Sequence, residues 1–278
     1  MKFLLIGLRR GVSSALTRAG HTCVYLPIDN LTIDTQQKRI YNYGEEVHYE
    51  DFDAIIMLSF PSKRINRYIY DMLRLAGVKV IGDPRERARA AGKVLCAIAL
   101  SAAGVPTIRT IYSDNDIPQR IAQTLGDNIV VKPAASSEGR GVSLQPSTAQ
   151  VPAGKLAQPY IECGASDERW LVVNGEVVCA MRRTATKEGE FRANLAQGGM
   201  GEPLVPDDAG TDLCKRAWNC FRDLVYAGID IIRDKGGNPY IVEINTIPGE
   251  RIIRITGHNY YDDIAKYIID YTTKHIKP

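Results

Sequence analysis

The chain has 278 residues, of which 45% are hydrophobic and 24% charged, as in an ordinary globular protein of two or three subdomains. Its 35 Lys and Arg against 32 Asp and Glu leave a net charge of +3, which gives no reason to expect nucleic acid as a partner. No apolar stretch approaches the roughly 18 residues that span a bilayer, and the opening run Phe3–Gly7 is too short for a signal peptide. We therefore expect a cytoplasmic protein with no membrane or nucleic-acid partner. The six cysteines form no C-x-x-C pair, so we expect reduced thiols.

The first 84 residues predict a small α/β lobe, because apolar runs of strand length alternate with helical segments. The strand-like runs are Lys2–Gly7, Thr22–Leu26, Asp53–Ser59 and Val78–Ile81. The glycines that follow the first run do not match the G-x-G-x-x-G dinucleotide fingerprint, so we predict no such cofactor here.

The next region predicts a phosphate-binding strand and loop. A helical pattern from Arg85 to Ala103 carries Lys93. The run Asn128–Lys132 then predicts a strand that ends at a lysine, followed by the Ser- and Gly-rich loop Ala134–Gly141. Small residues let backbone N–H groups approach phosphate oxygens, and the lysine supplies a positive charge. The loop is not a Walker A motif, and an ordinary Gly-rich turn remains the alternative.

A hairpin and a long loop follow. Asn174-Gly175 between two apolar runs predicts a tight β-hairpin. The polar, Gly-rich segment from residue 184 to residue 200 predicts a functional loop such as a lid, since long irregular loops in compact domains usually carry function. It contains Arg192, a candidate phosphate clamp, and Asn194, a candidate polar ligand. The alternative is that both are solvated loop residues. Asp207–Tyr226 then predicts a helix with one apolar face.

The stretch Gly228–Gly249 predicts a metal-binding hairpin, with Gly236-Gly237 as its two-residue turn. Counting outward from that turn places Asp230 opposite Glu243, and the strand period of two places Asn245 on the same face. Two carboxylates and an amide oxygen are hard ligands suited to Mg²⁺ or Mn²⁺. The alternative is that both acids face solvent on a half-exposed hairpin.

Several motifs thus lie in a fixed order along the chain: Lys132, Ser136–Gly141, Asp167–Arg169, Glu188–Leu195 and Glu243–Gly249. In this order they resemble the ATP-grasp ligases, and most closely the RimK branch, which includes glutamate ligases and LysX-type enzymes. The resemblance is clear from about residue 85 onward and weaker before it.

The resemblance implies an ATP-grasp fold, α/β and α+β, in three parts. An N-terminal α/β pre-ATP-grasp lobe would span residues 1–84, and a small central lobe residues 85–157. A C-terminal lobe with the metal hairpin would span residues 158–278. Related enzymes are commonly dimers or tetramers, so the resemblance also makes a homo-oligomer possible.

The resemblance also assigns residues to ATP. The phosphates would contact basic and small residues, namely Lys132, Lys93, Ser136, Ser137, Gly139 and Gly141. The adenine would meet Pro159 and Tyr160, and Asp167 would approach the ribose. Because Pro159 has no N–H to offer, adenine recognition would depend on the N–H of Tyr160 and on carbonyls.

The catalytic assignments come from the same resemblance. Arg192 and Asn194 would close over the triphosphate, and Lys132 and Arg192 would stabilise the charge that develops during transfer. Mg²⁺ or Mn²⁺ would be held by the hairpin ligands Asp230, Glu243 and Asn245.

The activity implied is that of an ATP-dependent carboxylate-amine ligase, which forms an amide or peptide bond through an acyl phosphate. It would add an amino acid such as glutamate to or from a small molecule, a cofactor or a protein tail. A small-molecule kinase on the same fold and a nucleotide-binding regulator without turnover are the alternatives. The substrate would lie near residues 59–67 and the loop after Gly249, where Arg251 and Arg254 could bind carboxylates.

Overall fold

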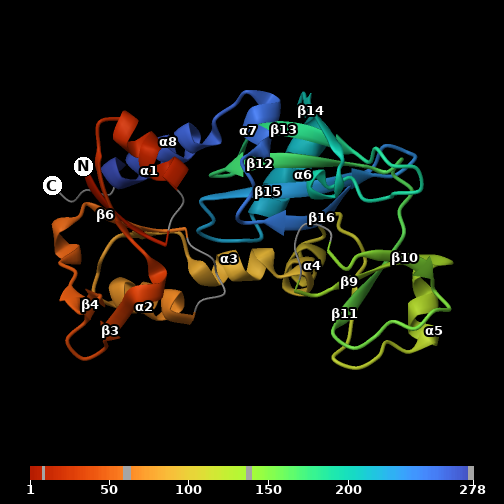
Figure 1. The fold of residues 1–278 in the computed structure, drawn as a ribbon, viewed down its shortest axis with the longest axis horizontal. Coiled ribbons are helices and arrows are strands. Elements are labelled where there is room, and N and C mark those ends of the chain that lie inside the picture. The colour runs from red at the N-terminus through yellow and green to blue at the C-terminus, as the bar shows by residue number, and fades with distance from the viewer. Residues whose placement is uncertain (8–9, 59–63, 136–139, 275–278) are drawn as a thin grey trace. The chain divides into compact units, whose positions relative to one another are not determined.

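The computed structural model describes residues 1–7, 10–58, 64–135 and 140–274 (Figure 1). The described chain divides into two compact units. One contains Met1–Ala88, Phe221–Tyr226 and Asn259–Pro278, and the other contains Arg89–Cys220 and Ala227–His258. The three-part division at residues 84 and 157 stays a prediction.

The first unit is built on a parallel sheet in the order β2-β1-β6-β7. Its strands are β1 (Lys2–Ile6), β2 (Thr22–Leu26), β6 (Ala54–Met57) and β7 (Val80–Ile81). A small antiparallel sheet consists of β3 (Leu31–Asp34), β4 (Arg39–Asn42) and β5 (Glu45–Glu46). The α-helices of the unit are α1 (Arg10–Arg18), α2 (Arg64–Leu75), α8 (Tyr260–Lys274) and the first part of α3 (Pro84–Ala91), which continues past Ala88 into the second unit. The parallel pairing of β1 with β2 and with β6 confirms the predicted α/β lobe.

The second unit contains two antiparallel sheets, in the orders β10-β9-β11-β8 and β14-β13-β12-β15-β16. The strands of the smaller sheet are β8 (Ile111–Tyr112), β9 (Asn128–Pro133), β10 (Ser143–Pro146) and β11 (Lys155–Pro159). Those of the larger sheet are β12 (Ser166–Val173), β13 (Glu176–Thr184), β14 (Met200–Leu204), β15 (Tyr226–Arg233) and β16 (Pro239–Asn245). The helices are α4 (Lys93–Ala102), α5 (Gln119–Ala122), α6 (Asp208–Trp218) and α7 (Arg251–Thr256). Short 3₁₀ turns occur at Ile28–Asn30, Tyr49–Asp51, Gln123–Leu125 and Leu195–Gln197.

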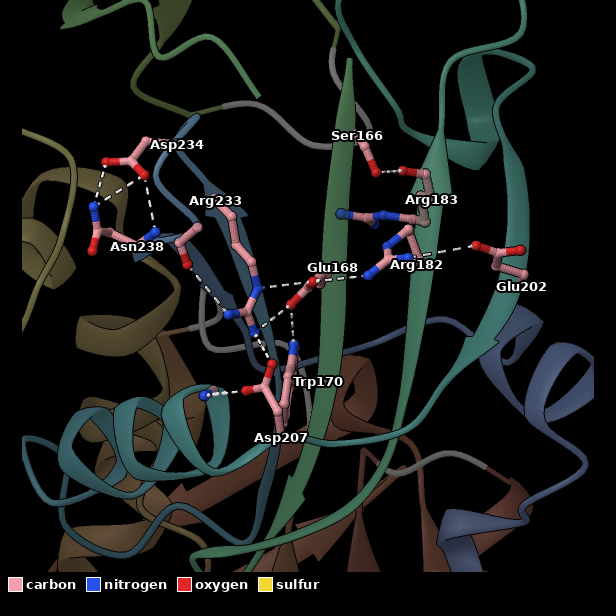
Figure 2. A network of polar contacts seen from close by, with 12 residues as sticks. Ser166, Glu168, Trp170, Arg182, Arg183, Glu202, Asp207, Arg233, Asp234 and Asn238 are labelled. Carbon is pink, nitrogen blue, oxygen red and sulfur yellow. Dashed lines mark hydrogen bonds and ion pairs between the residues drawn. The ribbon is translucent and has the colours of Figure 1, made fainter. Parts of the chain in front are cut away.

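Helix α6 covers one face of the larger sheet, and Trp170 fixes it there (Figures 1 and 2). The indole is fully buried, and its Nε1 donates to the carboxylate of Glu168 at 3.0 Å. That carboxylate also accepts from Arg233 Nε at 3.0 Å, and Arg233 reaches Asp207, the N-cap residue of α6, at 2.8 Å. Because side chains alternate along a strand, the neighbours of Trp170 point to the opposite face, where the candidate site lies.

Two predicted helices are shorter in the structure. The segment 85–103 is two helices, because Gly92 is extended (φ −76°, ψ 109°) and separates α3 from α4. The helix predicted to reach Tyr226 ends at Trp218. Its apolar pattern continues through the buried Phe221 and Leu224, but Asp223 has a positive φ of 54°, which a helix cannot contain. Phe221 and Leu224 are buried although their backbone is irregular, and their spacing matches that of the apolar face of a helix.

The contact between α6 and Trp170 gives a stability prediction. A Cβ atom at Gly210 would lie 2.3 Å from Trp170 Cζ2. Gly210→Ala should therefore lower the free energy of unfolding by about 1–3 kcal/mol through overpacking, although alanine favours helices. The matched control is Gly249→Ala, since no atom lies within 4 Å of a Cβ there. Urea unfolding of both variants tests this, and equal midpoints would contradict the packing role.

Candidate active site

The hairpin of β15 and β16 places Asp230 directly opposite Glu243, as predicted. The predicted turn, however, is wrong. Asp234 N–H donates to Asn238 O at 3.1 Å, so the loop has three residues and not two. A β-bulge between Asp230 and Ile231 on the ladder then shifts the register by one residue and restores the predicted pairing. The longer turn and the bulge shift the register in opposite directions, so Asp230 still lies opposite Glu243.

The face of the hairpin that carries these acids forms the floor of a pocket in the second unit. Its apolar lining includes Ile108, Val130, Val142, Ile161, Phe191, Ile232 and Val242. The lining includes nine residues predicted from the sequence, namely Lys93, Lys132, Pro159, Tyr160, Asp167, Arg192, Asn194, Asp230 and Glu243. The bulge explains why the consecutive residues Val242 and Glu243 both line it. The structure thus brings most of the predicted site into one cavity.

Five predicted residues are not among the described residues that line the pocket. Ser136, Ser137 and Gly139 fall outside the described residues. Gly141 adjoins the pocket residue Val142 and has φ +70°, a conformation in which a Cβ would also lie 3.0 Å from Pro133. Asn245 does not line the pocket.

Two lysines face Glu243. Lys93, in the first turn of α4, lies 3.8 Å from the Glu243 carboxylate. Lys132 is only 6% exposed. Burial lowers the pKa of Lys132, the charge of Lys93 lowers it further, and Glu243 opposes the shift. Two adjacent ammonium groups therefore depend on an anion for compensation, and a polyphosphate would supply more negative charge than the single carboxylate.

Asp230 is held by two arginines that the sequence analysis did not assign. Arg169 donates from Nε and Nη2 to the two carboxylate oxygens, each at 2.7 Å. Arg183 lies on β13, and its side chain extends across β12, so that Nη2 lies 3.0 Å from Asp230 Oδ2. Its Nε and Nη2 also donate to Asp167 at 2.5 and 2.7 Å. Burial alone would raise the pKa of Asp230, but Arg169 and Arg183 outweigh it and lower the pKa to about 2. The carboxylate is therefore ionised throughout the physiological range.

The pKa of Asp167, the second carboxylate that Arg183 contacts, shifts in the opposite direction to that of Asp230. Burial raises the pKa of Asp167, and the pairing with Arg183 does not fully offset this rise. The Arg183 guanidinium is shared between the two carboxylates, and its pKa is raised because their attraction exceeds the cost of burial. The sequence shows only that Asp167 and Arg169 share one face of β12 and that Arg182 and Arg183 are adjacent on β13, which does not reveal their partner on β15.

The oxygen atoms available to a metal can be counted. An ionised carboxylate has about four acceptor positions. Among the described residues, Asp230 Oδ2 accepts from both arginines, whereas Oδ1 accepts only from Arg169. Asn245 Oδ1 accepts one hydrogen bond, from the N–H of Ile247 at 2.9 Å. Each of the three predicted ligands can thus offer one oxygen, with Asp230 limited to Oδ1, so the donor set fits Mg²⁺ by its chemistry.

The described residues contain no cluster of three His, Cys, Asp or Glu side chains arranged for a metal. The predicted set has two carboxylates and an amide, so the hairpin ligands stay a prediction.

The loop after β13 places its arginine over the pocket through a local ion pair. Arg192 Nε and Nη2 donate to the Glu190 carboxylate at 2.9 and 2.7 Å, and the Arg192 N–H donates at 2.9 Å. Arg192 lowers the pKa of Glu190 to about 2. Asn194 precedes the 3₁₀ turn, and its carbonyl accepts from the N–H of Gln197 at 2.8 Å.

The expected adenine contact at Tyr160 needs correction. The Tyr160 N–H donates to the carbonyl of Asn128 at 3.1 Å, which continues the ladder between β11 and β9. Because backbone groups alternate in direction along a strand, the carbonyl of Pro159 and the N–H of Ile161 point away from β9. These two groups, and not the N–H of Tyr160, are the candidates for base recognition.

A sheet-borne pocket with two lysines, a carboxylate hairpin and an overlying arginine defines a nucleotide-dependent ligase of the ATP-grasp class. The model of the RimK-like ATP-grasp domain matches residues 90–271. The chain belongs to this family and is an ATP-dependent carbon–nitrogen ligase that joins a carboxylate to an amine. ATP-grasp ligases use ATP.

Relatives and solved structures agree with this assignment. A probable alpha-L-glutamate ligase 1 of Shewanella sp. (strain ANA-3) is 32% identical, over 95% of this chain and 91% of the relative. A probable alpha-L-glutamate ligase of Chromohalobacter salexigens is 32% identical, over 97% and 92%.

Among solved structures, the ATP-grasp ligase PsnB in complex with minimal precursor, Mg and ADP has a TM-score of 0.71 at 17% identity, over 98% of each chain. The RimK domain protein of Sphaerobacter thermophilus DSM 20745 has a TM-score of 0.66 at 16% identity, over 97% of this chain and 100% of the other. Both support the predicted ATP-grasp fold. In the part of the chain that the structure describes, no helix has the length and apolar character to cross a membrane.

The ion pair over the pocket predicts a titration. The ordinary pKa of Glu190 is 4.5, and Arg192 holds it near 2. The ion pair between Glu190 and Arg192 therefore stabilises the folded protein fully above about pH 4.5, and this contribution is lost as the pH falls through about 2. In an Arg192→Met variant the Glu190 pKa should rise toward 4.5, measured by carbon-13 NMR of the side-chain carboxyl group. Arg182→Met, which removes an arginine from the opposite face, should leave it near 2. A wild-type value near 4.5 would contradict the pairing.

Proposed function

We propose that this chain is an α-L-glutamate ligase, which phosphorylates the terminal carboxylate of an acceptor and joins it to the amino group of L-glutamate. The names of the relatives support the glutamate, and their similarity covers nearly the whole chain. The pocket supports the activation step, since it combines an apolar end with a strongly charged end.

The apolar end would hold the adenine between Val130, Ile161 and Val242. The carbonyl of Pro159 would accept from the exocyclic amine, and the N–H of Ile161 would donate to a ring nitrogen. Because proline loses only its N–H, Pro159 can still serve as this acceptor. Asp167 would contact the ribose.

The charged end would hold the triphosphate. Lys93 and Lys132 would bind its oxygens, and Arg192 would cover them from the loop, with Asn194 as a further polar contact. Mg²⁺ would be held by Asp230 Oδ1, Glu243 and Asn245, and when bound it would neutralise charge between the β- and γ-phosphates. A solved neighbour with Mg and ADP bound supports this choice of metal.

The chemistry would proceed by two displacements. An acceptor carboxylate oxygen attacks the γ-phosphorus, the bond to the bridging oxygen breaks and ADP leaves. The glutamate amine then attacks the acyl carbon, inorganic phosphate leaves with the attacking oxygen, and the amine loses a proton. Lys132 and Arg192 stabilise the charge that develops on the transferred group.

The observation that carries the proposal is the pairing of Asp230 with Glu243 on the pocket floor, opposite two lysines. A kinase on this fold would need the same charges, but it would make a stable phosphorylated product without an amine. A regulator without turnover would not need the complete set.

Glu243→Gln tests the proposal, because it removes a negative charge from the metal and phosphate end while keeping the shape. Turnover should fall by about 10² to 10³. The assay incubates the protein with ATP, Mg²⁺, hydroxylamine and glutamate-terminated peptides, and mass spectrometry detects hydroxamate together with ADP.

The control is Glu202→Gln, an exposed acid that pairs loosely with Arg182 on β13. It should keep wild-type turnover. Full turnover in a folded Glu243→Gln variant would contradict the assignment, and a stable phosphorylated product without hydroxamate would favour the kinase.

A further inference from the structure

The first unit carries a concentration of negative charge in one short segment. Residues 28–53 contain seven Asp and Glu against two Lys and Arg, a net charge of −5. Because the whole chain has a net charge of +3, the other residues together carry +8. The segment contains the small sheet of β3, β4 and β5 and the 3₁₀ turn Tyr49–Asp51. As far as the structure describes the lining of the nucleotide pocket, this segment contributes nothing to it.

This acidic segment borders an open cavity of about 290 Å³ within the first unit. The cavity has an apolar floor, formed by Leu4, Val24, Leu26, Val47 and Phe52. These side chains belong to the core of the unit or pack against it. The exposed part of the lining is a mostly acidic rim of Glu45, Glu46, His48 and Asp51. A groove of this kind suits a ligand that is apolar along its length and cationic at one end.

The chain's own cations compensate the rim only in part. Arg39 Nη1 lies 3.1 Å from Glu46 Oε1, and His48 Nδ1 lies 3.8 Å from the same oxygen. Glu45 and Asp51, in contrast, form no ion pair with any described residue. No lysine or arginine that the structure describes lines the cavity. Two carboxylates of the rim are therefore available to a cationic ligand.

A third acceptor lies beside them. Asn42 pairs with Glu45 across the turn between β4 and β5, so the two side chains project from the same face of the small sheet. The Oδ1 atom of Asn42 is buried and accepts no hydrogen bond from a described residue, although Asn42 lines the cavity. A buried acceptor without a donor is unfavourable, and native structures rarely keep one. A ligand N–H that reached this atom would remove the penalty.

The surroundings of the cavity indicate what occupies it. Lys2, which does not line the cavity, holds its ammonium 4.6 Å from the ring centroid of the floor residue Phe52, so this chain already packs one lysine against that ring. Tyr43 occupies the turn between β4 and β5 and is 73% exposed, and Tyr25 lies on β2 next to two floor residues and is 53% exposed. Tyrosine is enriched where proteins contact one another, which favours a polypeptide over a free amine.

We infer that this cavity binds the side chain of a lysine presented by a basic segment of a partner polypeptide. The apolar stem would lie on the floor, and the ammonium would reach the rim. An ammonium has three N–H donors, and the described lining offers three acceptors for them, in Glu45, Asp51 and the Oδ1 of Asn42. The other acids of residues 28–53 would attract further positive charges of the partner. The inference goes beyond the proposed function and does not depend on it.

The test titrates the peptide acetyl-GSKSG-amide into the full chain at about 0.15 M ionic strength, followed by nitrogen-15 NMR. The peptide should shift the side-chain amide signal of Asn42 and the backbone signals of β4 and β5. Norleucine in place of the peptide's lysine removes the charge, and diaminobutyrate shortens the stem, so each should raise the Kd at least about fivefold. Equal affinity of the three peptides would overturn the inference, as would a lysine peptide that does not bind.

Variants of the rim locate the binding. Glu45→Gln combined with Asp51→Asn should raise the Kd of the lysine peptide at least about tenfold, since two charge-assisted contacts are lost. The matched control is Glu176→Gln combined with Asp212→Asn, which removes the same charge from side chains of the second unit that are 73% and 68% exposed. It should leave the Kd within about twofold, because exposed charges outside the cavity are screened. An equal effect of both pairs would indicate attraction to net charge alone and would overturn the cavity as the site.

Asn42→Leu removes the third acceptor and keeps a similar shape. It should raise the Kd of the lysine peptide at least about threefold, whereas the urea midpoint of unfolding should not fall, because an unpaired buried acceptor is removed. Unchanged affinity in the folded variant would overturn the role of the carbonyl. Spermidine is the probe for a free polyamine, and tighter binding of spermidine than of the lysine peptide would overturn the assignment to a polypeptide. None of these titrations involves ATP or turnover, so failure of the ligase proposal would leave their outcome unaffected.

Discussion

The ion pair between Asp230 and Arg169 is the interaction on which the candidate site depends. A buried carboxylate is costly unless charged donors compensate it, and here two guanidinium groups do so. The pairs join β13, β12 and β15, so the same contacts that keep Asp230 ionised also fix the strands that carry the rest of the floor. The ion pairs that compensate the charge of Asp230 therefore also set the relative positions of the strands that form the site.

The opposite face of the sheet supports this arrangement. Glu168 and Trp170 alternate with Asp167 and Arg169 along β12, and they join Arg233 and the N-cap of α6 into a second polar network (Figure 2). A strand between two such layers cannot slip by one residue without exchanging them. The register of β12 is thus specified from both faces, and the precision of the pocket follows from it.

The sequence was sufficient for those features that depend on local patterns. The opposition of Asp230 and Glu243, the Asn174-Gly175 hairpin and the position of Lys132 follow from strand periodicity and turn chemistry, and the structure has all three. The hairpin also shows the limit of this reasoning, because a longer turn and a bulge compensated each other. Neither has a signature that separates it from the simpler turn.

Features that depend on three-dimensional neighbours could not be predicted. Arg169 and Arg183 look like ordinary strand residues until β15 is placed beside β12. The N–H of Tyr160 looked available because its partner, Asn128, is distant in sequence. The segment after α6 kept a helical apolar pattern because Phe221 and Leu224 are buried, although Asp223 has left-handed backbone. In each case tertiary packing, and not local propensity, determined the outcome.

The most direct test of the acyl-phosphate ligase account follows a single oxygen atom. L-glutamyl-L-glutamate labelled with oxygen-18 in its terminal α-carboxylate is incubated with the protein, ATP, Mg²⁺ and L-glutamate, and the released phosphate is analysed by mass spectrometry. The account predicts one labelled oxygen in each inorganic phosphate formed with the new amide bond. Amide formation that leaves the phosphate unlabelled would contradict it.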